Sequence, residues 1–160
     1  MPSIEIIETD LSDPLHADAL LGLLCDYASK LIVGGNGLSE QAKSNLISGL
    51  REHPTKLILL AWDNKTPVGF CVCMRGFSTF GGRGTINVHD LAVAEKYQGC
   101  GIGTAIMNRV FVEATASNCC KVTLEVERSN AGARRLYERL GFRGNDEFAD
   151  STMFFLEHPL

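Results

Sequence analysis

The sequence predicts a mixed α+β fold in a single domain that spans residues 1–160. Apolar residues recur at helical spacing in four segments, and short apolar runs between turn residues predict six strands. The predicted order is β-α-α-β-β-β-α-β-α-β, a mixed central sheet. A composition of 45% hydrophobic and 21% charged residues is that of an ordinary globular domain. A chain of this length can bury a core without disulfides or metals.

The chain opens with an alternating segment, residues 3–9, that predicts an edge strand. Ser12 or Asp13 then offers an N-cap for a helix, with Pro14 in its first turn. The helical spacing of this segment is carried by Leu20, Leu23, Leu24, Tyr27 and Leu31.

A second helix is expected between a glycine-rich break and a proline. Glycines at positions 34, 35 and 37 end the first helix, Ser39 caps the next one, and Pro54 ends it. The expected buried stripe of this helix consists of Ala42, Leu46, Ile47 and Leu50.

The middle of the chain predicts an antiparallel meander. Residues 56–62 form a continuous apolar run, as expected of a strand covered on both faces. A turn over 63–67 leads into a partner strand over 68–74, and a glycine-containing loop leads into a third strand over 85–93.

The second half predicts one right-handed βαβ crossover. The expected elements are a helix over 101–118, a strand over 121–127, a short helix that Ser129 or Asn130 caps and Gly141 ends, and a strand over 152–157.

Charge and hydropathy narrow the classes of partner. The net charge of −4 and the lack of a basic block argue against nucleic acid, whose binding requires a basic face. The longest apolar run, residues 57–62, is too short to cross a membrane. No basic segment followed by an apolar run opens the chain, so we expect no signal peptide and a cytoplasmic protein without a membrane partner.

The six cysteines are expected to be reduced thiols. Cys71 and Cys73 share one face of a strand, and Cys119 and Cys120 are adjacent. Neither pair has zinc-site spacing, so we expect small buried hydrophobic side chains and no metal.

The segment Gln98–Thr104, QGCGIGT, predicts an anion site where a strand passes into a helix. A helix N-terminus presents unpaired N–H groups and partial positive charge. Glycines at 99, 101 and 103 let the backbone approach phosphate oxygens and adopt positive φ. A dinucleotide fingerprint fails because Thr104 replaces its third glycine, and an ATP-type P-loop fails because Gly-Lys-[Ser/Thr] is missing. A turn that only permits tight helix packing is the remaining alternative.

The pattern Gln98-x-x-Gly101-x-Gly103 after an apolar strand resembles motif A of the GCN5-related N-acetyltransferases (GNAT superfamily). A second segment of that family, N…A…Y…GF, resembles the residues that follow at its usual spacing: Asn130, Ala133, Tyr137 and Gly141-Phe142. The stretch from Phe77 to Leu91 resembles the polyamine (spermidine/spermine-type) branch of the superfamily.

The resemblance implies acetyl-CoA as cosubstrate. It assigns the pantetheine arm to backbone groups of Leu91, Ala92 and Val93 and to the side chain of Asn130. It assigns the pyrophosphate to backbone N–H groups of Gln98, Gly99, Cys100, Gly101, Ile102, Gly103 and Thr104.

The resemblance places Tyr137 near the thioester sulfur, as the acid that protonates the leaving thiolate. Its spacing alone would suit a core aromatic residue. His89 stands where the polyamine branch has a Glu that helps to deprotonate the amine, and imidazole titrates near neutral pH. His89 as base and His89 as an ordinary strand residue are both open. Asp90 can attract a cationic amine, but adjacent strand residues face one pocket only where a bulge intervenes.

The predicted function is transfer of acetyl from acetyl-CoA to the primary amine of a small molecule, polyamine-like or amino-acid-like, by direct attack. Two alternatives are a protein or peptide N-acetyltransferase and a non-catalytic acyl-CoA-binding module. Substrate contacts are expected from residues 31–38 and 77–84, with Tyr27, Glu125 and Glu127 as pocket walls. The family resemblance allows a homodimer.

Overall fold

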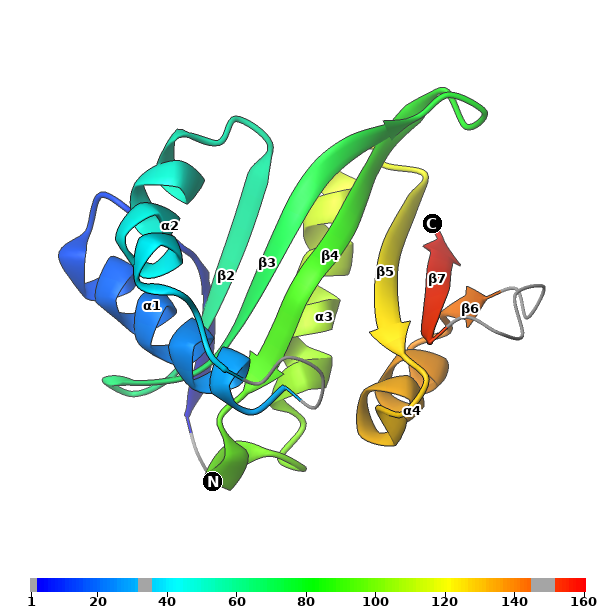
Figure 1. Ribbon diagram of the computed structural model, residues 1–160. Helices are drawn as coiled ribbons and strands as arrows, with labels where there is room; N and C mark the ends of the chain where they lie inside the picture. The colour runs from blue at the N-terminus through cyan, green and yellow to red at the C-terminus, as the bar shows by residue number, and fades with distance from the viewer. Residues whose placement is uncertain (1–2, 32–35, 145–151) are drawn as a thin grey trace.

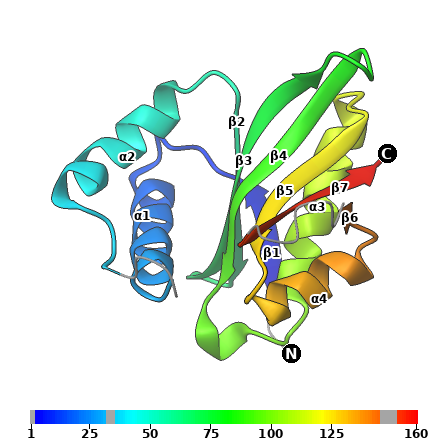
Figure 2. The same ribbon diagram turned by 45° about the vertical axis from the view of Figure 1, so that its right-hand side comes forward.

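The computed structural model of the protein describes residues 3–31, 36–144 and 152–160. These residues form a seven-stranded sheet with helices on both faces (Figures 1 and 2). The strand order is β1-β2-β3-β4-β5-β7-β6, and β4 and β5 are its parallel neighbours. The predicted mixed α+β class and the β4-α3-β5 crossover are therefore confirmed.

The elements in chain order are β1 (Ile4–Glu8), α1 (Pro14–Ser29), α2 (Glu40–Glu52), β2 (Lys56–Asp63), β3 (Thr66–Ser78), β4 (Arg83–Val93), η1 (Glu95–Tyr97), α3 (Ile102–Ala116), β5 (Lys121–Glu127), α4 (Ala131–Arg139), β6 (Arg143–Gly144) and β7 (Met153–Pro159). The predicted order lacks η1 and β6. Both have three residues or fewer, which is too short to show a period. No helix among the described residues is long and apolar enough to span a membrane.

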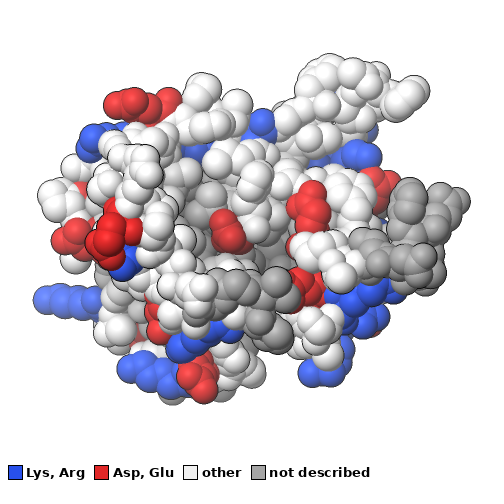
Figure 3. All heavy atoms as spheres, in the orientation of Figure 1, with Lys and Arg blue, Asp and Glu red and all other residues white. Residues whose placement is uncertain are grey.

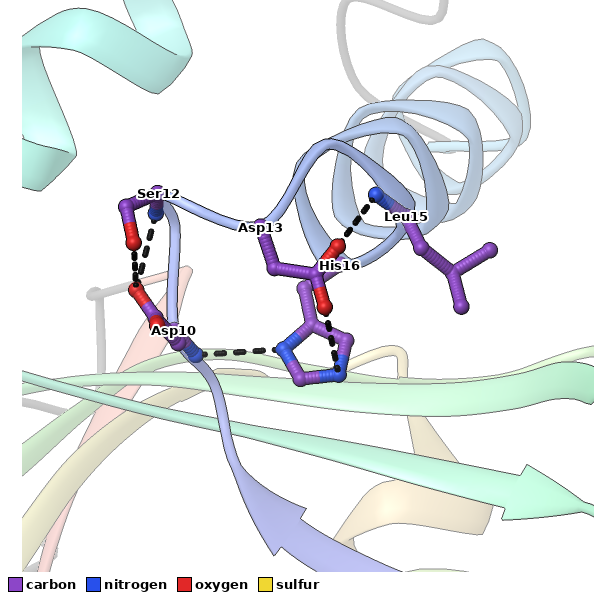
Figure 4. A network of polar contacts seen from close by, with 5 residues as sticks. All are labelled: Asp10, Ser12, Asp13, Leu15 and His16. Carbon is purple, nitrogen blue, oxygen red and sulfur yellow. Dashed lines mark hydrogen bonds and ion pairs between the residues drawn. The ribbon is translucent and has the colours of Figure 1, made fainter.

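The start of α1 is held by a polar network (Figure 4). Asp13, rather than Ser12, is the N-cap, and its Oδ1 accepts a hydrogen bond from the Leu15 N–H at 2.9 Å. Asp10 accepts from the N–H and hydroxyl of Ser12, which lowers the pKa of the Asp10 carboxyl. His16 Nδ1 in turn accepts from the Asp10 N–H at 3.2 Å. These contacts fix the direction in which α1 leaves β1.

Two hydrophobic cores lie on opposite faces of the sheet. One packs α1 and α2 against β2 and β3, and the other packs α3 and α4 against the opposite face. The expected stripe of α2 is only half-buried, because that helix rests at the rim of the first core. Its N-cap is Ser39, as predicted.

Strands β4 and β5 are paired along only part of their length. The parallel pairing runs from Thr85 opposite Lys121 to Val88 opposite Leu124. Beyond that point β4 remains paired with β3, and β5 remains paired with β7 through Glu127. Each strand therefore follows its outer neighbour, and the two diverge (Figure 1).

A bulge in β4 lies where this divergence begins. Asp90 pairs with Val72, whereas Val88 pairs with the next residue of β3, Cys73, so His89 is the extra residue. Val88 belongs to the core on the α3 side, whereas Ala92 packs against the core on the α1 side. Because the bulge reverses the alternation, His89 and Asp90 both lie on the α1 side of the sheet.

Candidate active site

A cleft of about 920 Å³ lies where β4 and β5 diverge. It is lined by α1, the bulged end of β4, the 98–104 loop, the end of β5 and α4. Figure 3 shows a hollow near the middle of the view, with acidic side chains inside it and on its right-hand rim. The expected cofactor and catalytic residues thus meet at one place, although the loop and α4 are separated by some thirty residues of sequence.

The loop from residue 98 to 104 presents its backbone to this cleft. Gly99 and Gly101 have φ values of 76° and 81°, and space is open where a Cβ would lie at each. Gly101 is the N-cap of α3. In the part of the chain that the structure describes, no hydrogen bond occupies the N–H groups of residues 99–104. Six successive donors at a helix start favour an anion.

Three residues of the loop have roles that differ from those expected. Gly103 lies inside α3 without positive φ, and a Cβ there would lie 3.2 Å from Leu136 Cδ2, so this glycine permits close packing of α4. The side chain of Gln98 donates to the Val93 carbonyl at 3.1 Å and ties the loop to the end of β4. The Cys100 side chain is exposed rather than buried, and Cys100 does not line the cleft.

Helix α4 brings Asn130 and Tyr137 to the cleft. Asn130 is the N-cap, and its Oδ1 accepts from the Ala133 N–H at 3.1 Å. Only the side-chain NH₂ of Asn130 is therefore left to bind a ligand. Tyr137 is buried, with its ring edge against Phe142 at 5.6 Å between centroids. Burial raises the pKa of Tyr137 far above its usual value, and nearby Cys71, Tyr27 and Cys73 add to the rise.

Opposite Tyr137, one tyrosine and two carboxylates converge from three elements. Tyr27 lines the cleft from α1 and stands edge-on to Phe70, and Glu127 lines it from the end of β5. Burial raises the pKa of Tyr27, and the charges of Asp90 and Glu127 raise it further. Burial also raises the pKa of Asp90. Asp90 itself lies beside the cleft without lining it, whereas His89 lines it.

Sequence reasoning missed two basic residues of the cleft. Arg135 and Arg139 lie one turn apart on α4, on the side of the helix that lines the cleft. No ion pair among the described residues occupies either guanidinium. Their spacing of four, flanking Tyr137, is the signal that could have identified them.

Several other expectations concern the surroundings of the cleft. Leu31, Glu125 and Glu127 line it, but residues 32–35 of the expected substrate segment lie outside the described residues. The 77–84 segment does not line the cleft. Cys71, Cys73 and Cys119 are buried thiols, as expected, and Cys25 and Cys120 are half-buried. The described ranges contain no group of three potential metal ligands.

Comparison with known proteins identifies the family. Residues 20–142 match the model of the Acetyltransferase (GNAT) family, which covers most of the chain. The chain therefore belongs to the GNAT family of acetyltransferases, whose acetyl donor is acetyl-CoA. The cleft, its glycine loop and its free N–H groups are the features of the fold that suit this donor.

The chain is similar to two curated proteins over about half its length. It is 40% identical over 87 residues to N-alpha-acetyltransferase MAK3 of Arabidopsis thaliana, covering 54% of this chain and 45% of the relative. It is 31% identical over 84 residues to [Ribosomal protein bS18]-alanine N-acetyltransferase of Haemophilus influenzae, covering 52% and 53%. The chain thus spans about half the length of these relatives. They support the family but not its polyamine branch.

Among solved structures, the chain resembles one from the NatC complex bound to Gag peptide and CoA. The TM-score is 0.74 with 22% identity, over 98% of each chain. At this identity the likeness shows the fold. The predicted GNAT-like architecture is confirmed by it and by the family match.

Proposed function

We propose that this protein transfers acetyl from acetyl-CoA to a primary amine by direct attack of the amine on the thioester. The observation that carries the proposal is the fork between β4 and β5. There a strand edge without a neighbour, a loop with six unoccupied N–H groups and the hydroxyl of Tyr137 border one cleft.

The residues present fit acetyl-CoA. Backbone N–H groups of residues 99–104 would hold the pyrophosphate, where the conformations of Gly99 and Gly101 leave open space. Arg135 and Arg139 would add positive charge for the phosphates. The free edge of β4, residues 91–93, would pair with the amides of the pantetheine arm.

When bound, acetyl-CoA supplies a thioester carbonyl that a neutral amine can attack, with a thiolate as leaving group. Tyr137 is the proton donor we assign, because it lines the cleft beside the β4 edge. Its raised pKa keeps the hydroxyl protonated throughout the physiological pH range. A free backbone N–H at the bulged end of β4 would polarise the carbonyl.

The acceptor ammonium must lose a proton before it attacks. His89 is the side chain we assign as base, because the bulge places it at the cleft on the side of Tyr27. Asp90 lies on the same face and would attract the ammonium rather than take its proton. A water chain between His89 and the amine is compatible with this arrangement.

We further propose that the acceptor is the terminal amine of a polypeptide. Two findings support this class: the names of the curated relatives, which specify an N-alpha-acetyltransferase and a ribosomal-protein N-acetyltransferase, and the acidic groups that surround Tyr27. A small cationic amine is the second candidate, because the same acidic groups would attract it.

A coenzyme A release assay tests the proposal. Purified protein is given acetyl-CoA with free-amine peptides, the same peptides blocked at the N-terminus but containing lysine, free amino acids and spermidine. We expect thiol release with free N-termini and none with blocked peptides. Release with spermidine alone would favour the second candidate. No release with any amine, in a protein that binds coenzyme A, would favour a non-catalytic acyl-CoA-binding module.

A further inference from the structure

One face of the sheet is covered at β2 and β3 but open at β5 and β7. Helices α1 and α2 pack over β2 and β3, and Figures 1 and 2 show no helix over the same face of β5 and β7. On this open face Glu125 pairs with Phe155, and Glu127 pairs with Met153. We call these four residues the β5–β7 shelf. Directly opposed residues of an antiparallel pair lie on one face, so each acid has an apolar neighbour.

The apolar half of the shelf is unusually exposed. Phe155 is 52% exposed and Met153 is 41% exposed, whereas Leu156, the next residue of β7, is 9% exposed in the core. Phe154 lies on the core side beneath the guanidinium of Arg128, 3.9 Å from the ring centroid. An apolar pair left open beside a binding cleft is the kind of surface that a ligand covers.

The acidic half of the shelf is held in place and not neutralised. The Asn87 amide donates to the Thr123 hydroxyl at 2.9 Å and to the Glu125 carboxylate at 3.3 Å, which orients that carboxylate across the β4–β5 seam. No ion pair among the described residues reaches Glu125 or Glu127. The shelf therefore presents negative charge and apolar surface together.

The shelf is continuous with the cleft. Glu125, Glu127 and Met153 all line it, and Phe155 is the direct neighbour of Glu125. A ligand whose amine lies between Tyr27 and Glu127 would leave the cleft across the shelf. An extended chain attached to that amine would bring its first side chains against Met153 and Phe155.

We propose that the β5–β7 shelf selects polypeptide acceptors by their first residues. It accepts apolar side chains on Met153 and Phe155, and its two glutamates reject acidic side chains while they attract the terminal ammonium. This inference rests on the proposed acetyl transfer to an amine and specifies its acceptor. A small polyamine would use the glutamates but would bury little of Phe155, so the two classes of acceptor respond differently to changes at that residue.

Steady-state kinetics with matched peptides test the inference. The peptides share one length and differ at the first three positions, which are apolar, serine-rich or acidic. We expect kcat/KM to be at least about 30-fold higher for the apolar peptide than for the acidic one, the product of one apolar contact and one repulsion of about 1 kcal/mol each. Phe155→Ser should raise KM for the apolar peptide about 5- to 10-fold and leave kcat and coenzyme A affinity unchanged.

Phe80→Ser is the matched control, because Phe80 is fully exposed at the β3–β4 hairpin and does not line the cleft. It should change no kinetic constant. Glu127→Gln should narrow the gap between the apolar and acidic peptides, and it keeps the inference testable if Phe155→Ser fails to fold in a thermal melt.

Equal kcat/KM for the three peptides, or a KM unaffected by Phe155→Ser, would overturn the inference while acetyl transfer stands. Turnover of spermidine that exceeds turnover of every peptide would also overturn it. Loss of all turnover with every amine would instead remove the proposed function.

Discussion

The two sides of the cleft recognise their ligands by different means. The donor side, which is the 98–104 loop and the free edge of β4, presents backbone groups whose positions follow from two positive-φ glycines and the start of α3. The acceptor side, which is Tyr27, Asp90 and the β5–β7 shelf, presents side chains from α1, β4, β5 and β7. One side thus depends on conformation, and the other depends on composition.

This difference has a consequence for how each side can change. A backbone site tolerates any side chain that preserves its φ and ψ, so it suits a donor that stays constant within a family. A side-chain site can change its ligand through single substitutions that leave the sheet intact. The fold therefore combines a conserved kind of donor site with an acceptor site that one or two residues can retune.

The largest effect is expected at the boundary between the two sides, in Tyr137→Phe. Loss of the proton donor should lower kcat about 100-fold, the lower end of the range for general acids. Coenzyme A affinity, measured by titration calorimetry, should stay the same because the ring remains. Tyr97→Phe is the control, since the Tyr97 hydroxyl points to Asp63 at 3.3 Å. An unchanged kcat in Tyr137→Phe would remove this residue from the chemistry.

The pH dependence of kcat gives a second measurement on Tyr137. An acid must be protonated to act, so activity falls as pH rises through its pKa. Burial raises the pKa of Tyr137 above the ordinary 10.0 of a phenol. The wild-type rate should therefore not fall near pH 10 because of this group. A fall at that pH that disappears in Tyr137→Phe would contradict the burial of the hydroxyl in the active protein.

On the donor side, Gly101→Val should weaken coenzyme A binding about 10- to 30-fold. Gly101 has φ 81°, and a β-branched residue there costs about 1–2 kcal/mol or forces the loop to move. Gly82→Val is the matched control, because Gly82 has φ 60° in the β3–β4 hairpin and does not line the cleft. The two variants should lose similar stability. Equal loss of coenzyme A affinity in both would mean that strain, rather than the phosphate site, is responsible.

Much of the fold and the donor side could be predicted because their signals are local in sequence. The bounds of β5, the Ser39 cap and the anion loop each follow from a few adjacent residues. The bulge at His89 could not be predicted, since no Gly or Pro marks it and it exists only in the register of β4 against β3. The packing role of Gly103 likewise depends on Leu136, which is distant in sequence.

The acceptor side was largely beyond prediction for the same reason. Glu125 and Glu127 were expected at the pocket wall, but their apolar neighbours Met153 and Phe155 become neighbours only through β5–β7 pairing. The resemblance to the polyamine branch was based on residues of β3 and β4 and did not include β7. Selectivity assembled from several strands leaves no contiguous motif.

A smaller effect on the donor side is expected from Gln98→Ala. The Gln98 side chain donates to the Val93 carbonyl and is exposed, so its loss should cost about 0.5–1.5 kcal/mol of loop order. Coenzyme A affinity should fall about 3- to 10-fold, with kcat unchanged. Gln41→Ala, at an exposed position of α2, should have no effect. A normal affinity in Gln98→Ala would show that the loop keeps its shape without this tie.

The smallest effect is expected on the acceptor side, in the stability of Asp90→Asn. Burial raises the pKa of Asp90, although His89 opposes the rise, so the folded protein disfavours the ionised carboxylate. Wild-type stability therefore falls as pH rises from the usual carboxyl pKa of 3.8 through the higher value in the fold. Asparagine is neutral throughout. The variant should thus melt higher at pH 7, by no more than about 3 °C for a change of ~1 kcal/mol in a domain of this length.

The pH window separates this cause from an ordinary packing change. The gain in melting temperature should vanish below about pH 4, where aspartate is protonated in both the folded and the unfolded chain. Asp18→Asn, on the outer surface of α1, should show no such difference between the two pH values. A gain in Asp90→Asn that persists at low pH would mean that charge is not its cause. Loss of peptide turnover together with the gain would show that the acceptor side sacrifices stability to hold a carboxylate near the amine.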